Sequence, residues 1–299
     1  METRAFGGTG MAVGVLGFGG AEIGFDRAEQ ALVTRLLNSA LDSGLNVIDT
    51  AECYLDGEAL IGRAVGKRRG EYFLFTKCGH PDYPGAEDWR PKSLLKSIQR
   101  SLKRLRTGHL DVVHLHGCSE EELRRGEVIL ALQAAKAKGY TRFIGYSGDS
   151  GAARCAVESG AFDSLQTSVN IADQESIDLT LPLAAERGMG VVAKRPIANA
   201  LWRLDRPPAN GFHVSYWERL RALGYDFAGV DEHAQAAAIA LRFTLAVPGV
   251  STAIVGTTKA GRWAENAAIA ASGPLPLDRF EAIRSRWLAV ADPSWVGQS

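Results

Sequence analysis

The 299-residue sequence lacks the features that mark secreted, membrane or nucleic-acid-binding proteins. Its four cysteines are scattered without a paired spacing, which predicts reduced thiols and neither a disulfide framework nor a zinc site. No apolar run reaches transmembrane length, and the N-terminus lacks the charged-then-apolar order of a signal peptide. The 34 basic residues balance the 34 acidic ones. This balance gives no reason to expect nucleic acid or an anionic membrane as a partner. We therefore expect a cytoplasmic protein.

The chain also lacks Pro- or Ser-rich linkers and low-complexity tracts, so we predict one domain over residues 1–299. Short apolar runs alternate with helical patterns. The predicted strands are Val13–Phe18, Leu45–Ile48, Tyr72–Thr76, Leu110–Leu115, Arg142–Tyr146, Ser164–Ser168, Gly190–Ala193 and Thr252–Val255. The helical patterns cover Glu29–Ser43, Glu58–Gly66, Pro91–Arg106, Glu120–Ala137, Ala152–Ser159, Ile177–Arg187 and Glu232–Leu245. This alternation predicts an α/β fold, a single (β/α)8 TIM barrel with a short N-terminal hairpin.

A doubly wound open sheet is the competing fold. It would require a nucleotide-binding glycine pattern directly before its first helix. The segment Leu16-Gly17-Phe18-Gly19-Gly20 is rich in glycine but does not fit GxGxxG. The closed barrel is therefore the preferred interpretation.

A long, aromatic-rich loop follows the seventh predicted strand and interrupts the regular alternation. It contains Trp202 and Trp217 among several other aromatic residues. Loops of this length in a compact domain are usually functional. We expect this one either to form an apolar wall of a substrate site, through Trp202 and Trp217, or to make a surface excursion with a small core of its own.

Three polar side chains stand where predicted strands meet their loops. Asp49 follows the second strand, Lys77 the third and His116 the fourth, and Tyr54 lies in the loop after Asp49. In a parallel α/β barrel, catalytic groups come from the C-terminal ends of several strands. Neighbouring strands lie only about 4.8 Å apart. We therefore expect these four side chains to meet.

The four residues resemble the Asp/Tyr/Lys/His tetrad of the aldo-keto reductases, NAD(P)H-dependent enzymes with a (β/α)8 barrel. The resemblance covers nearly the whole chain and depends on the order and spacing of several short motifs. These are Leu16-Gly17-Phe18-Gly19, Asp49-Thr50-Ala51-Glu52-Cys53-Tyr54, Glu58-x-x-x-Gly62, Thr76-Lys77, Asp111–His116, Ile144-Gly145-Tyr146-Ser147, Gln166-x-x-x-Asn170 and Arg262-x-x-Glu265-Asn266.

The resemblance implies an enzyme that reduces aldehyde or ketone carbonyls of small molecules to alcohols. The reverse oxidation, for example of a sugar hemiacetal, would use the same residues. A barrel that binds NADP(H) as a redox-sensing or regulatory subunit, with little turnover, is the alternative. The resemblance implies no metal, and the sequence leaves the oligomeric state open.

The chemistry of the four side chains agrees with these roles. Carbonyl reduction needs a hydride donor at the carbon and a proton donor at the oxygen. The free pKa of tyrosine is about 10, and a nearby Lys77 ammonium is expected to lower the pKa of Tyr54. Asp49 can pair with Lys77 and orient it, and His116 can donate to the substrate oxygen. We predict that Tyr54 is the general acid.

His114 is a rival to His116, because alternation along the strand places both on the same side. His116 occupies the family position after Asp111-x-x-x-x. His114 stands where the family commonly has an aromatic residue. We therefore prefer His116.

At the nicotinamide end of the cofactor, the resemblance places Ser147 and Gln166 next to the carboxamide. Gly20 and Asp49 are also predicted to contact the cofactor. The residue after Ser147 is usually Asn in the family and is Gly148 here. One hydrogen bond to the carboxamide is then either missing or made by Asp149 or water.

The segment Lys194-Arg195-Pro196-Ile197 also departs from the family pattern. Lys194 stands where many members have an aromatic residue that stacks on the nicotinamide. Basic residues at this strand end can instead hold the pyrophosphate, so we predict cofactor contacts from all four positions.

The resemblance implies that the adenosine end of the cofactor lies at the start of the last family helix. Hydroxyl groups, free backbone N–H groups and the helix dipole there suit an anion. The predicted contacts are Gly256, Thr257, Thr258, Lys259, Arg262, Glu265 and Asn266. A common family lysine is Gly256 here, whereas Arg262 matches. We therefore expect NADPH to be preferred and NADH to be usable.

The C-terminal segment, Pro274–Ser299, includes Trp287 and Trp295. In the family this segment caps the rim of the active site. The sequence leaves open whether it does so here or packs on the barrel.

Overall fold

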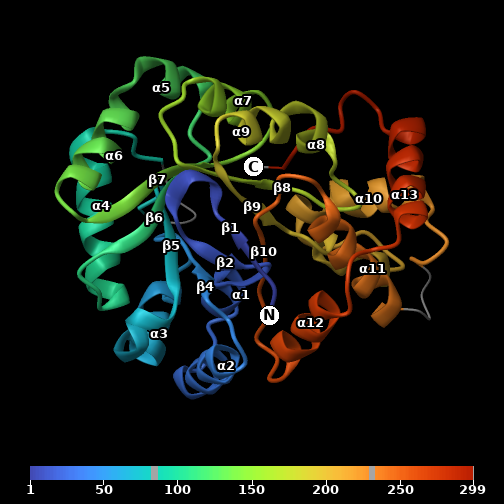
Figure 1. The fold of residues 1–299 in the computed structure, drawn as a ribbon, viewed down its shortest axis with the longest axis horizontal. Coiled ribbons are helices and arrows are strands. Elements are labelled where there is room, and N and C mark those ends of the chain that lie inside the picture. Colours follow the sequence, from blue (N-terminus) through green and yellow to red (C-terminus); the bar gives the residue numbers. More distant parts are fainter. Residues whose placement is uncertain (82–86, 229–232, 299) are drawn as a thin grey trace.

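The computed structural model describes residues 1–81, 87–228 and 233–298. Eight parallel strands close into a barrel in the order β10-β3-β4-β5-β6-β7-β8-β9. They are β3 (Leu16–Gly19), β4 (Val47–Asp49), β5 (Phe73–Cys78), β6 (Leu110–His116), β7 (Thr141–Ser147), β8 (Ser164–Ser168), β9 (Gly190–Lys194) and β10 (Thr252–Val255). Helices surround this ring (Figure 1). The predicted (β/α)8 barrel is confirmed.

The helices follow the predicted pattern with two corrections. The outer helices include α2 (Gln30–Asp42), α3 (Gly57–Val65), α4 (Pro91–Leu105), α7 (Ser150–Glu158), α11 (His233–Ala246), α12 (Arg262–Ala271) and α13 (Leu277–Val290). The predicted helix Glu120–Ala137 is instead two helices, α5 (Glu120–Arg125) and α6 (Glu127–Ala137). Gly126 separates them because it adopts a left-handed conformation, with φ of 78°, that glycine tolerates.

The second correction concerns the predicted helix Ile177–Arg187. It is also two helices, α8 (Glu175–Leu179) and α9 (Leu181–Glu186). Thr180 joins them with ψ of −33° and φ of −122°. Pro182 follows in the first turn of α9, where its missing N–H is tolerated. Glu232, the predicted start of the next helix, lies outside the described residues.

An antiparallel hairpin, β1 (Thr3–Ala5) and β2 (Ala12–Gly14), precedes the barrel. The first barrel strand therefore starts at Leu16, and the predicted strand Val13–Phe18 was too long at its N-terminal end. A short 3-10 helix, η1 (Gly7–Thr9), forms the turn, and the backbone of Gly8 donates to Gly188 just before β9. The hairpin thus covers the N-terminal end of the barrel.

The barrel interior is apolar near the hairpin. Phe6 of the hairpin packs against Phe75 of β5, with ring centroids 5.3 Å apart. The interior cluster consists of Phe6, Met11, Val13, Val47, Phe75, Val112, Val192 and Ile254. Because side chains alternate along a strand, the next inward positions on β4, β5 and β6 are Asp49, Lys77 and His114. The interior therefore becomes polar toward the C-terminal ends of the strands.

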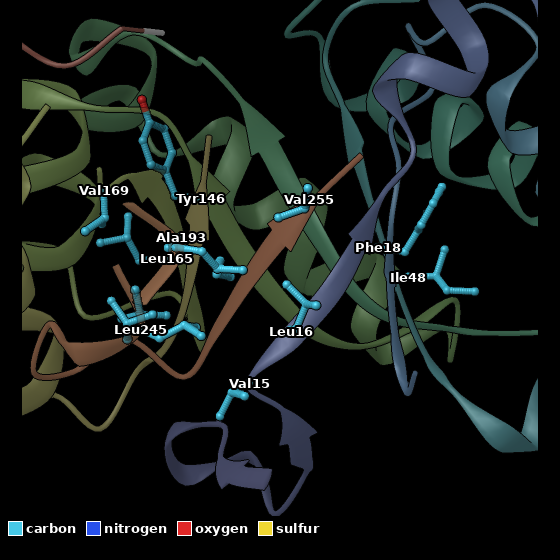
Figure 2. Close-up of a cluster of buried hydrophobic side chains, with 14 of the residues drawn as sticks. Val15, Leu16, Phe18, Ile48, Tyr146, Leu165, Val169, Ala193, Leu245 and Val255 are labelled. Carbon is cyan, nitrogen blue, oxygen red and sulfur yellow. The ribbon is translucent and has the colours of Figure 1, made fainter. Parts of the chain in front are cut away.

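A second and larger apolar cluster lies between the strands and the helices. Figure 2 shows ten labelled members of it, among them Leu16 and Phe18 of β3 and Ile48 of β4. A Cβ at their inward neighbour Gly17 would lie 3.1 Å from Val47, so the inner wall is tightly packed at this point. The barrel is therefore packed on both sides of its wall.

The long connection after β9 is present but is not a structureless loop. It holds two 3-10 helices, η3 (Ala198–Arg203) and η4 (Gly211–His213), and the helix α10 (Val214–Leu223). Trp202 is buried in the larger apolar cluster, and Trp217 is half-buried against it. Trp217 also donates through Nε1 to the Leu204 carbonyl at 2.8 Å. These contacts tie the segment to the barrel's main core.

The chain shows no membrane-crossing element within the described residues, because none of their helices is long and apolar enough. All four cysteines are free thiols. Cys53, Cys78 and Cys118 are buried, whereas Cys155 is half-buried.

The close contact of α3 with α4 provides a test of the packing. A Cβ at Gly62 would lie 2.2 Å from the Arg104 carbonyl oxygen. In an open helix, Gly→Ala stabilises by up to about 1 kcal/mol. Here we expect Gly62→Ala to lower the free energy of unfolding by about 1–3 kcal/mol, as measured by urea denaturation.

The matched control is Gly70→Ala, because a Cβ at Gly70 would meet nothing within 4 Å. Its effect should stay within about 0.5 kcal/mol. A neutral or stabilising Gly62→Ala would contradict the close approach of the two helices.

Candidate active site

The four predicted side chains come together at the C-terminal end of the barrel. Lys77 Nζ lies 2.6 Å from Asp49 Oδ2 and donates to the Thr50 carbonyl at 2.9 Å. It also lies 5.0 Å from the centroid of the Tyr54 ring and hydrogen-bonds with that side chain. The rings of Tyr54 and His116 are 6.0 Å apart, edge to face.

Strand register explains this convergence. Asp49 pairs with Phe75 of β5, and Lys77 pairs with His114 of β6. Lys77 is therefore one inward position further along its strand than the partner of Asp49, and its long side chain spans this step to the Asp49 carboxylate. Tyr54 reaches the group from the loop after β4, where its backbone N–H donates to Ala51.

The Lys77–Asp49 pair is buried, with each side chain only 2% exposed. Burial is the largest single influence and would lower the pKa of Lys77, but Asp49 and Tyr54 together outweigh it, so the pKa is raised above its usual value. Lys77 is therefore a fixed positive charge next to Tyr54 at neutral pH.

The pKa of Tyr54 differs from the prediction. Burial raises it to about 12, even though Lys77 acts in the opposite direction. The expected net decrease is therefore wrong, because the sequence could not reveal how deeply Tyr54 is buried. Tyr54 is protonated at neutral pH.

The two histidines have different surroundings. His116 Nδ1 lies 3.5 Å from Cys53 Sγ, and His116 contacts the Tyr54 ring. His114 is fully buried, with Nε2 3.1 Å from Ser164 Oγ and its ring against Phe75. Burial lowers the pKa of His116 well below its usual value and that of His114 to about 3. Both rings are neutral, and only His116 contacts Tyr54.

Sequence reasoning missed several neighbours of the four residues. His80 Nε2 donates to the His116 carbonyl at 2.5 Å, and its ring packs against His116. Glu52 accepts hydrogen bonds from the backbone of Gly79 and His80 and pairs with Arg100 at 2.5 Å. The only signal for His80 was its position three residues after Lys77, just past the strand end.

The predicted nicotinamide contacts connect directly to the four residues. Ser147 Oγ donates to Gln166 Oε1 at 3.1 Å, and Gln166 Nε2 donates to Asp49 Oδ1 at 2.9 Å. One buried hydrogen-bond chain therefore runs from Ser147 through Gln166, Asp49 and Lys77 to Tyr54. Gly20 lies beside this chain and donates from its backbone to the Asp49 carbonyl at 2.7 Å.

The packing around position 148 explains why a glycine stands there and not the family's asparagine. A Cβ at this position would lie 2.6 Å from the hydroxyl of Tyr146. That hydroxyl donates to the Cys118 carbonyl at 2.8 Å, and Tyr146 is buried. A side chain at position 148 would therefore require Tyr146 to move.

Lys194 is not a freely solvated charge. Its Nζ pairs with Asp149 Oδ2 at 2.8 Å, and the Asp149 side chain is 2% exposed. Asp149 also accepts from Thr167 Oγ1 and the Ser168 backbone, each at 2.7 Å. Burial alone would raise the pKa of Asp149, but Lys194 and these donors lower it. Asp149 is thus an ionised acceptor already engaged by neighbouring groups.

The C-terminal tail, residues 295–298, docks on this same end of the barrel. Figure 1 shows the chain returning from α13 toward the middle of the ring. The Gln298 carbonyl accepts from Lys194 at 3.3 Å and also from Arg195. Gly297 N donates to Glu175 Oε2 at 2.6 Å. The tail therefore covers the two cations that were predicted to hold a pyrophosphate.

The two tail tryptophans lie in different environments. Trp287 of α13 is 5% exposed, and its ring centroid is 5.5 Å from that of Trp295. Trp295 also lies 5.6 Å from the guanidinium of Arg219. Of the two interpretations left open, α13 thus packs on the barrel and the residues after it lie over the strand ends. Ser299 lies outside the described residues.

The predicted adenosine segment combines cations with carboxylates. A Cβ at Gly256 would lie 1.6 Å from Glu22 Oε2, so Glu22 fills the space of the family lysine. Thr258 Oγ1 donates to Asp26 at 3.4 Å, and Arg262 pairs with Glu265 at 2.8 Å. This pair is solvent-accessible, and Arg262 is 43% exposed.

The other predicted cofactor contacts have mainly structural partners. Thr257 Oγ1 accepts from the backbone of Lys259 at 3.0 Å, and Asn266 is buried in α12. The Pro196 carbonyl accepts from Thr244 Oγ1 at 2.9 Å. Ile197 is partly buried against the larger apolar cluster.

The donor set suits an organic cofactor with a carboxamide, because Ser147 and Gln166 offer a hydroxyl and an amide. Lys194 and Arg195 lie at the same strand end, but both donate to the tail and Lys194 is also paired with Asp149. Among the described residues, no group of three or more His, Cys, Asp or Glu side chains could hold a metal ion.

The buried ion pair can be tested without any assay of activity. Lys77→Met leaves the Asp49 carboxylate buried without its cation, so we expect a loss of about 3–5 kcal/mol in the free energy of unfolding. Adding Asp49→Asn to this variant should recover part of the loss. Denaturation of the single and double variants gives the coupling energy.

The control for this cycle is Lys67→Met, which makes the same change at an exposed lysine. It should alter stability by no more than about 0.5 kcal/mol. Additive effects of Lys77→Met and Asp49→Asn would show that the two groups do not interact.

Comparison with known proteins agrees with this geometry. The sequence model described as the Aldo/keto reductase family matches residues 12–287. L-galactose dehydrogenase of Arabidopsis thaliana is 29% identical over 292 residues, which cover 90% of this chain and 88% of that protein. The uncharacterized oxidoreductase YqkF of Bacillus subtilis is 27% identical, with 95% and 96% covered. The holo form of aldo-keto reductase AKR11C1 from Bacillus halodurans superimposes with a TM-score of 0.83 at 24% identity, covering 99% of both chains.

Proposed function

The chain belongs to the aldo/keto reductase family, and we propose that it interconverts carbonyls and alcohols with NAD(P)H as the redox partner, with Tyr54 as the proton donor. The observation that carries this proposal is the buried chain of contacts from Asp49 through Lys77 to Tyr54, with a neutral His116 beside the tyrosine.

The roles follow from the charges of these groups. A bound nicotinamide cofactor supplies or accepts the hydride. In reduction, Tyr54 gives its proton to the carbonyl oxygen, and the resulting tyrosinate is stabilised by the Lys77 ammonium. Asp49 holds Lys77 in position. The neutral His116 donates a hydrogen bond to the same oxygen and so favours carbonyl geometry.

The state of Tyr54 favours reduction near neutral pH. With a pKa of about 12, Tyr54 carries the proton that reduction needs across the physiological range. Alcohol oxidation needs the deprotonated form instead, so its rate should rise with pH. The similarity to a galactose dehydrogenase makes sugar hemiacetals a reasonable class to test in that direction.

The substrate site is proposed to lie above Tyr54 and His116. Trp202 and Trp217 are the proposed apolar wall, and the partial exposure of Trp217 suits a contact with substrate better than the buried Trp202 does. The tail at residues 295–298 borders the same end of the barrel.

The catalytic proposal is tested by Tyr54→Phe, which deletes only the hydroxyl. General acid catalysis typically contributes 10²–10⁴-fold, so we expect kcat to fall by about that factor while cofactor affinity is retained. NADPH absorbance with and without an aldehyde measures turnover, and fluorescence titration measures cofactor binding.

Tyr140→Phe is the control, because it removes a surface hydroxyl bonded to Gln99. It should leave kcat unchanged. If Tyr54→Phe kept most of its kcat, another group would be the proton donor. If the unaltered protein bound NADPH but turned over no carbonyl or alcohol, the regulatory-barrel alternative would stand instead.

For cofactor choice we propose that NADPH is preferred and NADH is usable. Guanidinium engages phosphate oxygens through paired donors, and Arg262 is the arginine of the adenosine segment. Glu265 within this segment and Glu22, which lies against Gly256, place carboxylates there. They weaken the attraction for a 2′-phosphate, so the preference is expected to be modest.

Arg262→Ala should raise the NADPH dissociation constant by about 10–100-fold, corresponding to about 1.5–3 kcal/mol for a charge-assisted hydrogen bond. NADH binding should hardly change. Glu22→Gln should act in the opposite sense and tighten NADPH. Fluorescence titration with both cofactors measures these dissociation constants, and Arg279→Ala on α13 is the control. If Arg262→Ala weakened the binding of NADPH and NADH equally, Arg262 would not recognise the 2′-phosphate.

A further inference from the structure

The groove between α3 and α4 contains a cavity that the catalytic proposal does not use. Its volume is about 380 Å³. The two helices lie next to each other on the outside of the barrel (Figure 1). The lining residues are Ala59, Arg63, Arg100, Lys103, Arg104 and Arg106. Five of these six side chains are cations, and the sixth is small enough to leave the groove open.

The carboxylates near the cavity do not neutralise it. Arg100 pairs with Glu52 at 2.5 Å, and Arg104 lies 3.5 Å from Glu58. Both carboxylates are buried. Five cations against these two carboxylates leave three positive charges at the cavity.

The remaining three cations are available to a ligand. Arg63 donates at 2.5 Å to the uncharged amide of Gln30. Lys103 and Arg106 are exposed, and neither has a carboxylate within 4 Å in the described part of the chain. The Nε of Arg100 is buried and makes no hydrogen bond to the described residues.

The backbone at Arg106 gives an independent indication. This residue is the C-cap of α4 and adopts a left-handed conformation, with φ of 55°. Glycine is preferred at such a position, yet the chain has an arginine at the rim of the cavity. Basic residues near a helix C-terminus do stabilise the helix. Stabilisation of α4 by its own basic residues does not explain why Arg63 on the neighbouring helix also faces the cavity.

We propose that this cavity binds a small molecule that carries two or more clustered phosphate groups. Guanidinium groups engage phosphate oxygens through paired donors, and lysine adds a point charge. Three uncompensated cations on a concave surface match several phosphate charges better than a single carboxylate. The cavity lies between α3 and α4 and is open to solvent, so a small phosphate compound can reach its cations.

The position of the cavity relates it to the proposed active site. Arg104 also donates to the Glu52 carbonyl at 3.1 Å, and Arg100 bonds the Glu52 carboxylate. Glu52 lies two residues before Tyr54. A ligand in the cavity would therefore contact the guanidinium groups that anchor the loop of Tyr54. The binding proposal itself does not depend on the catalytic one.

Calorimetric titration with inorganic tripolyphosphate at low ionic strength tests the proposal. The variant Lys103→Gln/Arg106→Gln removes two exposed cations from the cavity and is expected to raise the dissociation constant by about 10–100-fold. Arg63→Gln alone should raise it about 10-fold. The affinity of the unaltered protein should fall as salt is added.

The matched control is Lys92→Gln/Lys96→Gln, which removes two exposed cations from the same helix outside the cavity. It should change the dissociation constant by less than about 2-fold. Circular dichroism of each variant shows whether the fold is retained.

Four results would overturn the proposal. The first is an absence of saturable binding, and the second is equal weakening in the lining and control variants, which would mean general charge attraction only. The third is citrate binding as tightly as tripolyphosphate. The fourth is tighter binding of a short single-stranded oligonucleotide than of tripolyphosphate, with this binding lost in the lining variants. The surface would then be a nucleic-acid contact.

Discussion

The buried ion pair between Lys77 and Asp49 is the interaction on which the rest of the site depends. Removing two charges from water costs several kcal/mol for each ion, and the pair is tolerated only when further hydrogen bonds satisfy it. Here the Thr50 carbonyl completes the shell of Lys77, and Gln166 completes that of Asp49. Gln166 is in turn bonded by Ser147. The predicted cofactor contacts thus also stabilise the ion pair.

This requirement explains the division of the barrel interior. The half near the hairpin is filled by apolar side chains such as Phe6, Phe75 and Val112, which exclude water from one end. The polar half then opens only toward the C-terminal ends of the strands. Charge–charge interactions are stronger where water is excluded, so the apolar half strengthens the influence of Lys77 on Tyr54.

Much of this architecture was predictable from the sequence, because it depends on local patterns. Strand ends at Asp49, Lys77 and His116 are visible as apolar runs that meet polar residues, and barrel closure follows from the number of repeats. The helix break at Gly126 was missed, because a glycine within a helical pattern often stays helical. The direction of the Tyr54 pKa shift was also missed. The effect of burial on this pKa outweighs that of Lys77, and the depth of burial of a side chain cannot be read from the spacing of residues in the sequence.

The three departures from the family pattern show what only the fold can explain. Gly148 leaves space for the Tyr146 hydroxyl, and Gly256 leaves space for the Glu22 carboxylate. Lys194 replaces an aromatic residue and has Asp149 as its ion-pair partner. Each departure therefore occurs together with a particular neighbouring side chain. For Gly256 and Lys194 that neighbour is far away in the sequence. For Gly148 it is only two residues away, but the sequence does not show that the two come into contact. Reverting one position alone would create a clash or leave a buried charge unpaired, so we regard each departure and its partner as one unit.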